Sequence, residues 1–545
     1  RSTPLYSSAA SDVYKRQLSH QMKNNLSKTA GVVSGITFVS RIFGFIRDMF
    51  IAMTFGSSIA ADAFFVAFRI PNMQRRVLGE GAIASAFIPV FSETLTQKGK
   101  QTAQELTANI FNILLILLSL ISLALFLFSP AVITVFAPGF LNDTEKFKLT
   151  VDLTRWMSPY LFFIGLSAFS MGVLNSLKVF ALPAATPILQ NISMIVAILI
   201  VVPQLDKPII GLAIGVLIGG ALQVFIQLPT IIKQGYGWKN YLHIKQPEVI
   251  KIAKLTGPAI LGLAVYELNL LVDTLLASTL PNGSISYLYY GNRLVQLPLG
   301  VFAVALAVVL LPTLSQHAAK GETKELVQTL NFSIRLILFI TIPATIGLII
   351  LSEPIVNTLW QRGEFLYTST QGTAVALVFY SIGLCAYSGI KIIAPAFYSL
   401  QDTKTPAKIG IYSMVLNIIL NLILMGPLKH GGLALATSIS ALFNVIALTY
   451  CLRKRLGLLG GRKILRSMLK MSIAACFMGI IIYYCNIFWF HLNDALEIRL
   501  TFLLGCISFG ILVYALISHF LKNEEWLYLL EMRKNKAHKF PANLN

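Results

Sequence analysis

Charged residues are scarce in this chain. Asp, Glu, Lys and Arg make up 12% of its 545 residues, whereas soluble proteins usually contain about 25% of them. Hydrophobic residues make up 56%, and apolar runs such as residues 110–128 and 188–202 indicate membrane spans. This composition excludes an ordinary soluble domain. It predicts an all-α polytopic membrane protein, because a helix satisfies its own backbone hydrogen bonds in lipid.

Sequence motifs of catalysis and cofactor binding are also missing. The five cysteines form no CxxC pair, the histidines form no HExxH pair, and there is no P-loop and no GxSxG. Gly79-x-Gly81-x-x-Ala84 matches a dinucleotide fingerprint only formally, because no strand precedes it. We therefore expect no enzyme, no cofactor, no zinc, and cysteines that are buried free thiols.

The net charge of +21 would suggest a nucleic-acid partner in a soluble protein. Here most basic residues lie in loops between apolar segments, so no nucleic-acid binding is expected. Lys and Arg concentrate in alternate loops, above all within 233–254, 453–470 and 522–539. The positive-inside rule then predicts that both termini are cytoplasmic.

Apolar segments of about 20 residues or more follow one another along the chain, and each predicts a transmembrane helix. There are fourteen, and they cover residues 29–54, 61–96, 105–136, 149–177, 183–203, 209–232, 249–279, 284–316, 325–350, 370–399, 406–426, 430–452, 464–487 and 498–520. Segment 209–232 contains Gly211, Gly215 and Gly219 at four-residue spacing, which permits close helix packing.

An internal repeat is indicated by two of these segments. Arg69 lies twenty residues before Pro89, and Arg293 lies nineteen before Pro312. Six segments separate the two copies, so the halves would be parallel repeats, as in many transporters. The predicted division is a tail of non-native, disordered residues 1–21 before a start at Met22, lobes 22–235 and 236–455, two added helices in 456–522, and a cytoplasmic tail 523–545.

Residues 40–93 carry more charge than membrane helices tolerate without a purpose. A charge at the centre of a membrane helix costs about 2.5–3.5 kcal/mol, so these side chains must face protein or water. At 100° per residue Asp62, Arg69 and Arg76 share one face, whereas Arg75 needs a kink at Pro71 to join them. The candidate binding residues here are Arg41, Arg47, Asp62, Arg69, Asn72, Arg75 and Arg76.

Two interpretations of this charge cluster stay open. Guanidinium groups match phosphate oxygens two at a time, so a phosphate or diphosphate is the expected ligand of the arginines. Alternatively the charges pair with one another, for example Arg47 or Arg69 with Asp48 or Asp62, and only hold two helices together.

A second intramembrane polar set combines Asp273 with Asn417 and Asn421, which are one turn apart. A carboxylate with amide oxygens could hold Na⁺ or relay a proton as a counter-ion. Hydrogen bonding between helices is the alternative.

Five stretches of the chain stand out as motifs. They are SRIFGFIRD, ADAFFVAFRIPNMQRRVLGEGAIASAFIPVFSE, SYLYYGNRLVQLPLGVFAVALAVVLLPTLS, LWQRGEF and APAFYSLQDTKTPAKIG. Together they resemble the MurJ (MviN) lipid II flippases of the multidrug/oligosaccharidyl-lipid/polysaccharide exporter superfamily, and the likeness runs from about Lys28 to about Phe520.

The resemblance implies two six-helix lobes around a central cavity and two extra C-terminal helices that form a lipid groove. It also implies movement of lipid II from the cytoplasmic to the periplasmic leaflet of the bacterial inner membrane by alternating access. Lipid II, membrane lipids and other cell-wall synthesis proteins are the expected partners. The membrane potential, Na⁺ or H⁺ would supply the driving force. The alternatives are export of another polyprenyl-linked oligosaccharide or of drugs, and an enzyme acting on polyprenyl diphosphates.

Carried over by motif, the family's cavity arginines correspond to Arg41, Arg47, Arg75 and Arg293, and its acidic partner to Asp62. Asn72 and Ser286 correspond to supporting positions. Some members have Glu where this chain has Gln296, so a carboxylate partner for Arg293 is missing at that position.

Overall fold

The computed structural model describes residues 6–75, 84–492 and 494–537, and every regular element in those ranges is a helix. Side chains are described in the same ranges except at 6–30, 84, 258–259, 261–266 and 532–537. Arg76 therefore lies outside the described residues. The chain forms two compact units, which are described in turn.

Unit 1 comprises Arg1–Ile51, Ala67–Val132 and Lys148–Ala264. Its elements are most of α1 (Tyr6–Phe55), the end of α2 (Ile59–Gln74), α3 (Ala84–Gln97), α4 (Gly99–Leu127), the start of α5 (Ser129–Phe136), most of α6 (Thr144–Ser176), α7 (Ala181–Val196), η3 (Ala197–Val201), η4 (Val202–Gln204), α8 (Pro208–Phe225), α9 (Leu228–Lys233) and the first half of α10 (Pro247–Ser278).

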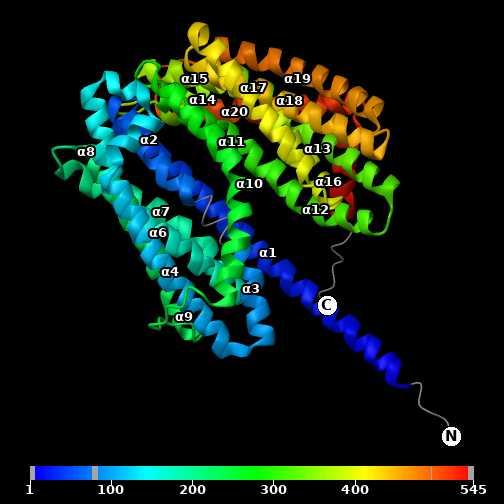
Figure 1. The fold of residues 1–545 in the computed structure, drawn as a ribbon. Coiled ribbons are helices and arrows are strands. Elements are labelled where there is room, and N and C mark those ends of the chain that lie inside the picture. The colour runs from blue at the N-terminus through cyan, green and yellow to red at the C-terminus, as the bar shows by residue number, and fades with distance from the viewer. Residues whose placement is uncertain (1–5, 76–83, 493, 538–545) are drawn as a thin grey trace, which may run out of the picture. The chain divides into compact units, whose positions relative to one another are not determined.

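The glycine stripe of α8 packs against α7 and η3 (Figure 1). A Cβ on Gly215 would lie 2.6 Å from the Cβ of Ala197, and one on Gly219 would lie 2.8 Å from the side chain of Gln190. Only hydrogen fits at such distances, so the predicted close packing of this segment is confirmed. In lipid this contact is stabilised by van der Waals packing rather than by removal of apolar surface from water.

Unit 2 comprises Ala52–Val66, Ile133–Phe147 and Val265–Asn545. It holds the junction of α1 and α2, the end of α5, η2 (Pro138–Asn142), the start of α6 and the second half of α10. Its remaining elements are α11 (Ser284–Pro298), η5 (Leu299–Ala303), α12 (Val304–Ala319), α13 (Thr323–Ile350), α14 (Ser352–Trp360), α15 (Tyr367–Ile382), α16 (Leu384–Ser399), α17 (Lys404–Leu428), α18 (His430–Leu456), α19 (Gly461–Trp489), α20 (Leu496–Phe520) and α21 (Glu524–Ala537).

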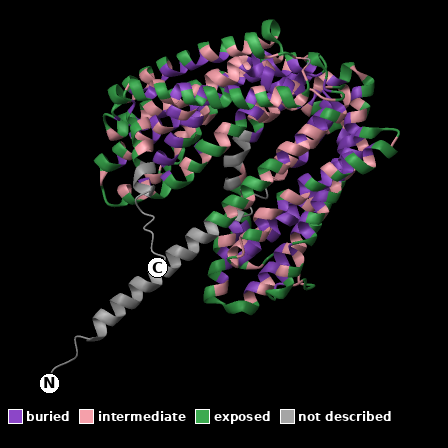
Figure 2. Ribbon diagram, turned by 180° about the vertical axis from the view of Figure 1, so that it is seen from behind, coloured by how far each residue is buried: buried purple, intermediate pink, exposed green. Residues whose placement is uncertain are grey.

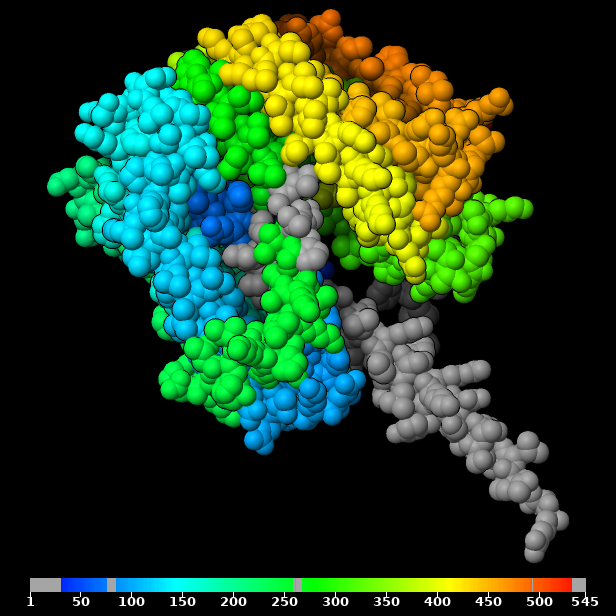
Figure 3. Space-filling view, in the orientation of Figure 1, coloured from blue at the N-terminus to red at the C-terminus, as the bar shows by residue number. Residues whose placement is uncertain are grey.

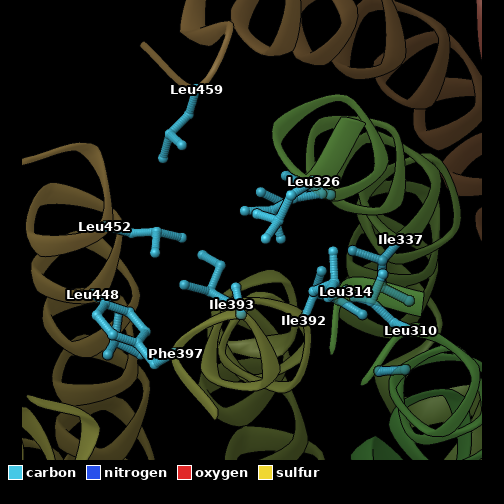
Figure 4. Packing of buried hydrophobic residues seen from close by; sticks show 14 of the residues in the cluster. Leu310, Leu314, Leu326, Ile337, Ile392, Ile393, Phe397, Leu448, Leu452 and Leu459 are labelled. Carbon is cyan, nitrogen blue, oxygen red and sulfur yellow. The ribbon is translucent and has the colours of Figure 1, made fainter. Parts of the chain in front are cut away.

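A buried apolar cluster holds α12, α13, α16 and α18 of unit 2 together (Figure 4). Leu314 of α12, Leu326 of α13, Ile392 of α16 and Leu452 of α18 are each at most 1% exposed. Leu459, in the turn after α18, completes the cluster. The cluster fixes the ends of these helices, and therefore the positions of the polar groups they carry.

Apolar side chains also cover the outside of both units. Buried residues lie where the helices of a unit pack together, and exposed residues follow the outer sides (Figure 2). In unit 2 the side chains of α17, α18 and α19 form one broad face (Figure 3). The exposed apolar residues of these helices include Tyr412, Ile423, Ile446, Phe477 and Phe488. Exposed apolar surface of this extent suits contact with lipid rather than water.

Within the described residues, 10 helices are long and apolar enough to cross a membrane, or up to 11 when the bent pair α15–α16 counts as one span. The described residues of the other three predicted segments are also helical and lie in α1, in α2 with α3, and in α10. The chain is thus an all-helical, multi-pass membrane protein, as predicted, while the count of fourteen spans stays a prediction. All five cysteines are free, as expected, but only Cys506 is buried: Cys476 is exposed, and Cys385, Cys451 and Cys485 are half-buried.

Candidate functional site

Asp62 is the centre of a buried polar network within unit 2. It lies in the first turn of α2, where a carboxylate suits the positive end of the helix dipole. Its Oδ2 accepts hydrogen bonds from Lys146 Nζ at 2.9 Å and from the backbone N–H of Gly283 at 2.8 Å. Its Oδ1 accepts from the backbone N–H of Ser286 at 3.0 Å and from its hydroxyl at 2.7 Å. Asp62 therefore caps the N-terminus of α11.

Lys146 places a buried positive charge in this network, and its neighbours compensate that charge. Lys146 lies in the first turn of α6, and its backbone N–H donates to the side chain of Asp143 at 3.0 Å. A cation is unfavourable at this end of a helix. Asp62 and the side-chain oxygen of Asn282, at 2.8 Å, compensate it, and the Phe140 ring lies 4.3 Å from Nζ. Lys146 is 3% exposed and Asp62 is 1% exposed, so the ion pair is fully desolvated.

Arg47 belongs to a second network, within unit 1. Its Nε and Nη2 both donate to Oδ1 of the buried Asp48, at 2.9 and 2.6 Å. Its Nη1 donates to the side-chain oxygen of Asn191 on α7 at 3.0 Å, and Asn191 in turn donates to the Ser40 carbonyl at 3.2 Å. The guanidinium plane is therefore held from two directions, which orients it for a further contact.

The remaining predicted arginines have different degrees of exposure. Arg41 on α1 is exposed, whereas Arg69 and Arg75 are half-buried. Asn72 donates to the Phe68 carbonyl one turn earlier, at 3.1 Å, so this amide nitrogen is bonded within α2. Among the predicted candidates of unit 1, Arg47 forms an ion pair with Asp48.

In unit 2, Arg293 and Ser286 both lie on α11, and they are separated by about two turns. Arg293 is half-buried, and Ser286 is fully buried through its bonds to Asp62. Gln296 donates to Asn292 at 2.6 Å. That amide is therefore engaged within α11.

The structure brings Asp273, Asn417 and Asn421 together. The Nδ2 of Asn421 donates to Asp273 Oδ1 at 2.7 Å and to Asn417 Oδ1 at 3.0 Å. With its amide turned over, Asn417 donates to the same carboxylate oxygen at 3.0 Å and accepts from the Thr437 N–H at 3.2 Å. Amide nitrogens then face the carboxylate, which suits hydrogen bonding between helices. A cation would instead need the amide oxygens to face it. No cluster of three or more His, Cys, Asp or Glu side chains occurs in the described part of the chain.

Sequence reasoning missed three participants in these networks: Lys146, Asn282 and Asn191. Lys146 is one of few basic residues in the lysine-poor set of loops. A lysine in loops that contain few basic residues could have indicated a structural role, because the positive-inside rule does not account for it there.

The chain is similar to known proteins over most of its length. The lipid II flippase MurJ family model matches residues 51–501. The probable lipid II flippase MurJ of Vibrio cholerae serotype O1 is 37% identical over 514 residues, which cover 91% of this chain and 96% of that protein. Lipid II flippase MurJ of Burkholderia cenocepacia is 35% identical over 435 residues, which cover 79% of this chain and 84% of that protein.

Solved structures agree with these relatives. Lipid II flippase MurJ in an inward closed conformation superposes with a TM-score of 0.77 at 32% identity, and the match covers 90% of this chain and 99% of that one. An inward-facing multidrug resistance MATE family transporter of the MOP superfamily gives a TM-score of 0.65 at 15% identity, over 79% of this chain and 98% of that one. The second likeness concerns the fold alone.

Proposed function

The chain belongs to the MurJ family of lipid II flippases, and on that premise we propose that it moves lipid II across the bacterial inner membrane. The observation that carries the proposal is the family match over residues 51–501. The transported molecule would be the undecaprenyl diphosphate carrier with its sugar and peptide, moving from the cytoplasmic to the periplasmic leaflet. Both termini would lie in the cytoplasm, as the distribution of Lys and Arg predicts.

The proposed ligand of the arginines is the diphosphate of the lipid II head group. Arg41, Arg47, Arg69 and Arg75 of unit 1 and Arg293 of unit 2 would supply the positive charge, together with Arg76. Arg47 supports this role best, because Asp48 and Asn191 fix its guanidinium plane. A preoriented guanidinium loses less conformational entropy when it binds an anion.

Asp62, Ser286 and Asn72 would act through other groups rather than by touching phosphate. The carboxylate of Asp62 accepts bonds from Lys146 and from the start of α11. This network supports a role in fixing α11, and with it Arg293, relative to the start of α2. Alternating access would require such networks to form in one state and to open in the other.

The driving force of the cycle is proposed to be the membrane potential with a counter-ion. Outward movement of an anion releases about 2.3 kcal/mol per charge per 100 mV when the inside is negative. The carrier must then return, and Asp273 with Asn417 and Asn421 is the candidate site for Na⁺ or a proton in that step. The hydrogen bonds among these residues would have to rearrange for Na⁺ to bind.

Two other functions compete with lipid II transport. MATE transporters share the fold, and export of a cationic drug is therefore an alternative, although a surplus of arginine disfavours a cationic ligand. Export of another polyprenyl-linked oligosaccharide would use the same arginines. We propose no catalytic step, since the relatives are flippases.

A head-group accessibility assay in proteoliposomes tests the proposal. Vesicles with lipid II and purified protein are expected to expose the head group to an external probe faster than protein-free vesicles. The assay is run with and without a membrane potential and Na⁺, and ethidium efflux is measured in parallel. Ethidium efflux without lipid II movement would transfer the assignment to drug export, and phosphate release from lipid II would indicate an enzyme.

A further inference from the structure

Two arginines meet at the C-terminal end of α14, within unit 2. Arg499, in the first turn of α20, donates from Nη1 to the Asn357 side-chain oxygen at 2.6 Å and to the Asn357 carbonyl at 3.5 Å. Arg362, just after α14, donates from Nη2 to the Thr358 carbonyl at 2.8 Å. Asn357 and Thr358 are fully buried. Both cations therefore lie at the negative end of the α14 dipole, where positive charge is favourable.

Capping α14 leaves part of each guanidinium unused. The Nε of Arg362 and the Nε of Arg499 are both buried and have no hydrogen-bond partner among the described residues. Arg499 makes both of its bonds through Nη1, so its Nε–Nη2 edge is the free one. A buried donor without a partner costs about 1–3 kcal/mol, and more when the group is charged. Two such donors at one place indicate a missing acceptor.

The two charges are also uncompensated by acid groups. Within the part of the chain that the structure describes, the hydrogen bonds of the two arginines go to Asn357 and Thr358, and none goes to a carboxylate. Burial lowers the pKa of Arg362, and the charge of Arg499 lowers it further. The nearest acids in sequence, Glu364 and Glu497, are exposed. Like charges held side by side without an anion destabilise each other.

We propose that Arg362 and Arg499 form a binding site for a phosphate oxyanion. The Nε–Nη2 edge of Arg499 matches two oxygens of one anion, and the Nε of Arg362 requires a third acceptor. A carboxylate has only two oxygens, whereas a phosphate offers three or more in a tetrahedral arrangement. The site therefore selects a phosphate monoester or diester over a carboxylate.

Two sources would present this chemistry, a lipid head group and free phosphate. Leu366 and Ile498, which lie close in sequence to the two arginines, are 61% and 55% exposed. Exposed apolar side chains beside a cationic site suit a phospholipid whose acyl chains pack on them. Free phosphate needs only the two guanidinium groups.

The site is attached to the turn between α1 and α2, so a bound anion would stabilise that turn as well. The Glu364 backbone N–H donates to the Met53 carbonyl at 2.9 Å. Gly363 adopts φ +54, and a Cβ there would lie 2.3 Å from the same carbonyl. The loop that carries Arg362 is therefore hydrogen-bonded to residues 53–56 and packs closely against them.

Thermal unfolding of the detergent-purified full chain tests this proposal. One arm titrates inorganic phosphate against sodium chloride of equal ionic strength. The other titrates dioleoylphosphatidylglycerol against dioleoylphosphatidylcholine in mixed micelles. We expect a saturable rise in Tm in at least one arm, and at least a tenfold weaker apparent affinity in Arg499→Gln. Gln keeps an N–H donor for Asn357 but removes the positive charge and the paired N–H donors of the Nε–Nη2 edge.

Matched variants separate a site from general electrostatics. Arg466→Gln removes an exposed arginine from α19 and is expected to keep the wild-type affinity. Arg499→Lys, which keeps the charge, is expected to bind at least fivefold more weakly, and it replaces Arg499→Gln if that variant fails to fold. A response to phosphate identifies a free anion, and a response to phosphatidylglycerol alone identifies a lipid. The proposal is overturned by no saturable rise in either arm, or by equal losses in the Arg466 and Arg499 variants. Neither result bears on lipid II transport.

Discussion

Lys146 Nζ lies 2.9 Å from Asp62 Oδ2, and both side chains are buried. The two residues are 84 positions apart, so the pair joins the start of α2 to the start of α6. The same carboxylate caps α11 through Gly283 and Ser286. One aspartate thus holds three helix N-termini of unit 2 in register, which makes it a positioning group for the residues that follow on α11.

Asp62→Asn is expected to destabilise the protein and to slow translocation. The change leaves the Lys146 charge buried without its anion, and breaking a buried ion pair in this way typically costs about 3–5 kcal/mol. Thermal unfolding in detergent and lipid II translocation in proteoliposomes measure the two effects.

A double-mutant cycle with Lys146→Met checks the physical reason for that loss. Asp62 keeps three donors from α11 when Lys146 is removed, so Lys146→Met is expected to lower Tm less than Asp62→Asn does. The double variant is expected to lose less Tm than the sum of the two single losses. Additive losses would show that the two side chains do not act as a pair.

The Lys98–Glu248 pair predicts a dependence of stability on acid pH. Lys98 Nζ lies 2.5 Å from Glu248 Oε1, and this hydrogen bond lowers the pKa of Glu248 below its ordinary value of 4.5. A lowered carboxyl pKa stabilises the fold above the unfolded-state value, and the gain is lost as pH falls through the folded-state value. The Tm difference between wild type and Lys98→Met should therefore be constant near neutrality and shrink below about pH 4.5.

The Lys251–Glu93 pair provides the matched control. It is 2.6 Å long, but both of its side chains are about half exposed, and exposed pairs contribute about 0–1 kcal/mol. Lys251→Met should change Tm less than Lys98→Met at neutral pH. The reverse order would contradict the assignment of the acid response to Glu248.

Arg335 is expected to hold the C-terminal helix α21 in place. It is 6% exposed, donates to Glu524 at 2.8 Å, and also pairs with Glu525, which is fully buried. Arg335→Gln leaves Glu525 without its cation, at a cost of about 3–5 kcal/mol. Limited trypsin digestion should then cleave after Lys522 at least tenfold faster.

Lys463→Gln is the control for this digestion. Lys463 lies 3.0 Å from Glu524, with both side chains more than half exposed. Its loss should change the cleavage rate less than twofold. Equal rates for Arg335→Gln and wild type would show that apolar contacts alone, such as Phe332 with Tyr528, hold α21.

The sequence predicts the helical class and the helix positions well, because apolar length and charge scarcity are local properties of the chain. It also predicts the grouping of Asp273 with Asn421, although 148 residues separate them. Polar groups within a membrane must find one another, so few partners are available to each.

The partner of Asp62 could not be read from the sequence. Helical periodicity places Asp62 on one face with Arg69, and it therefore predicts that Asp62 pairs with an arginine. In the structure α2 is shared between the units: residue 66 ends the part in unit 2, and Arg69 belongs to unit 1. The partner comes instead from the start of α6, and the division of a helix between two packed units depends on tertiary contacts that periodicity does not encode.

We propose that arginines bind the diphosphate of lipid II during its movement. The head-group accessibility assay tests this with Arg293→Ala and Arg41→Ala protein at wild-type membrane levels, and with Arg462→Ala at the exposed start of α19 as the control. We expect at least a tenfold loss of translocation rate for Arg293→Ala and Arg41→Ala, equivalent to about 1.4 kcal/mol or more, and an unchanged rate for Arg462→Ala. Wild-type rates in all three variants would contradict it.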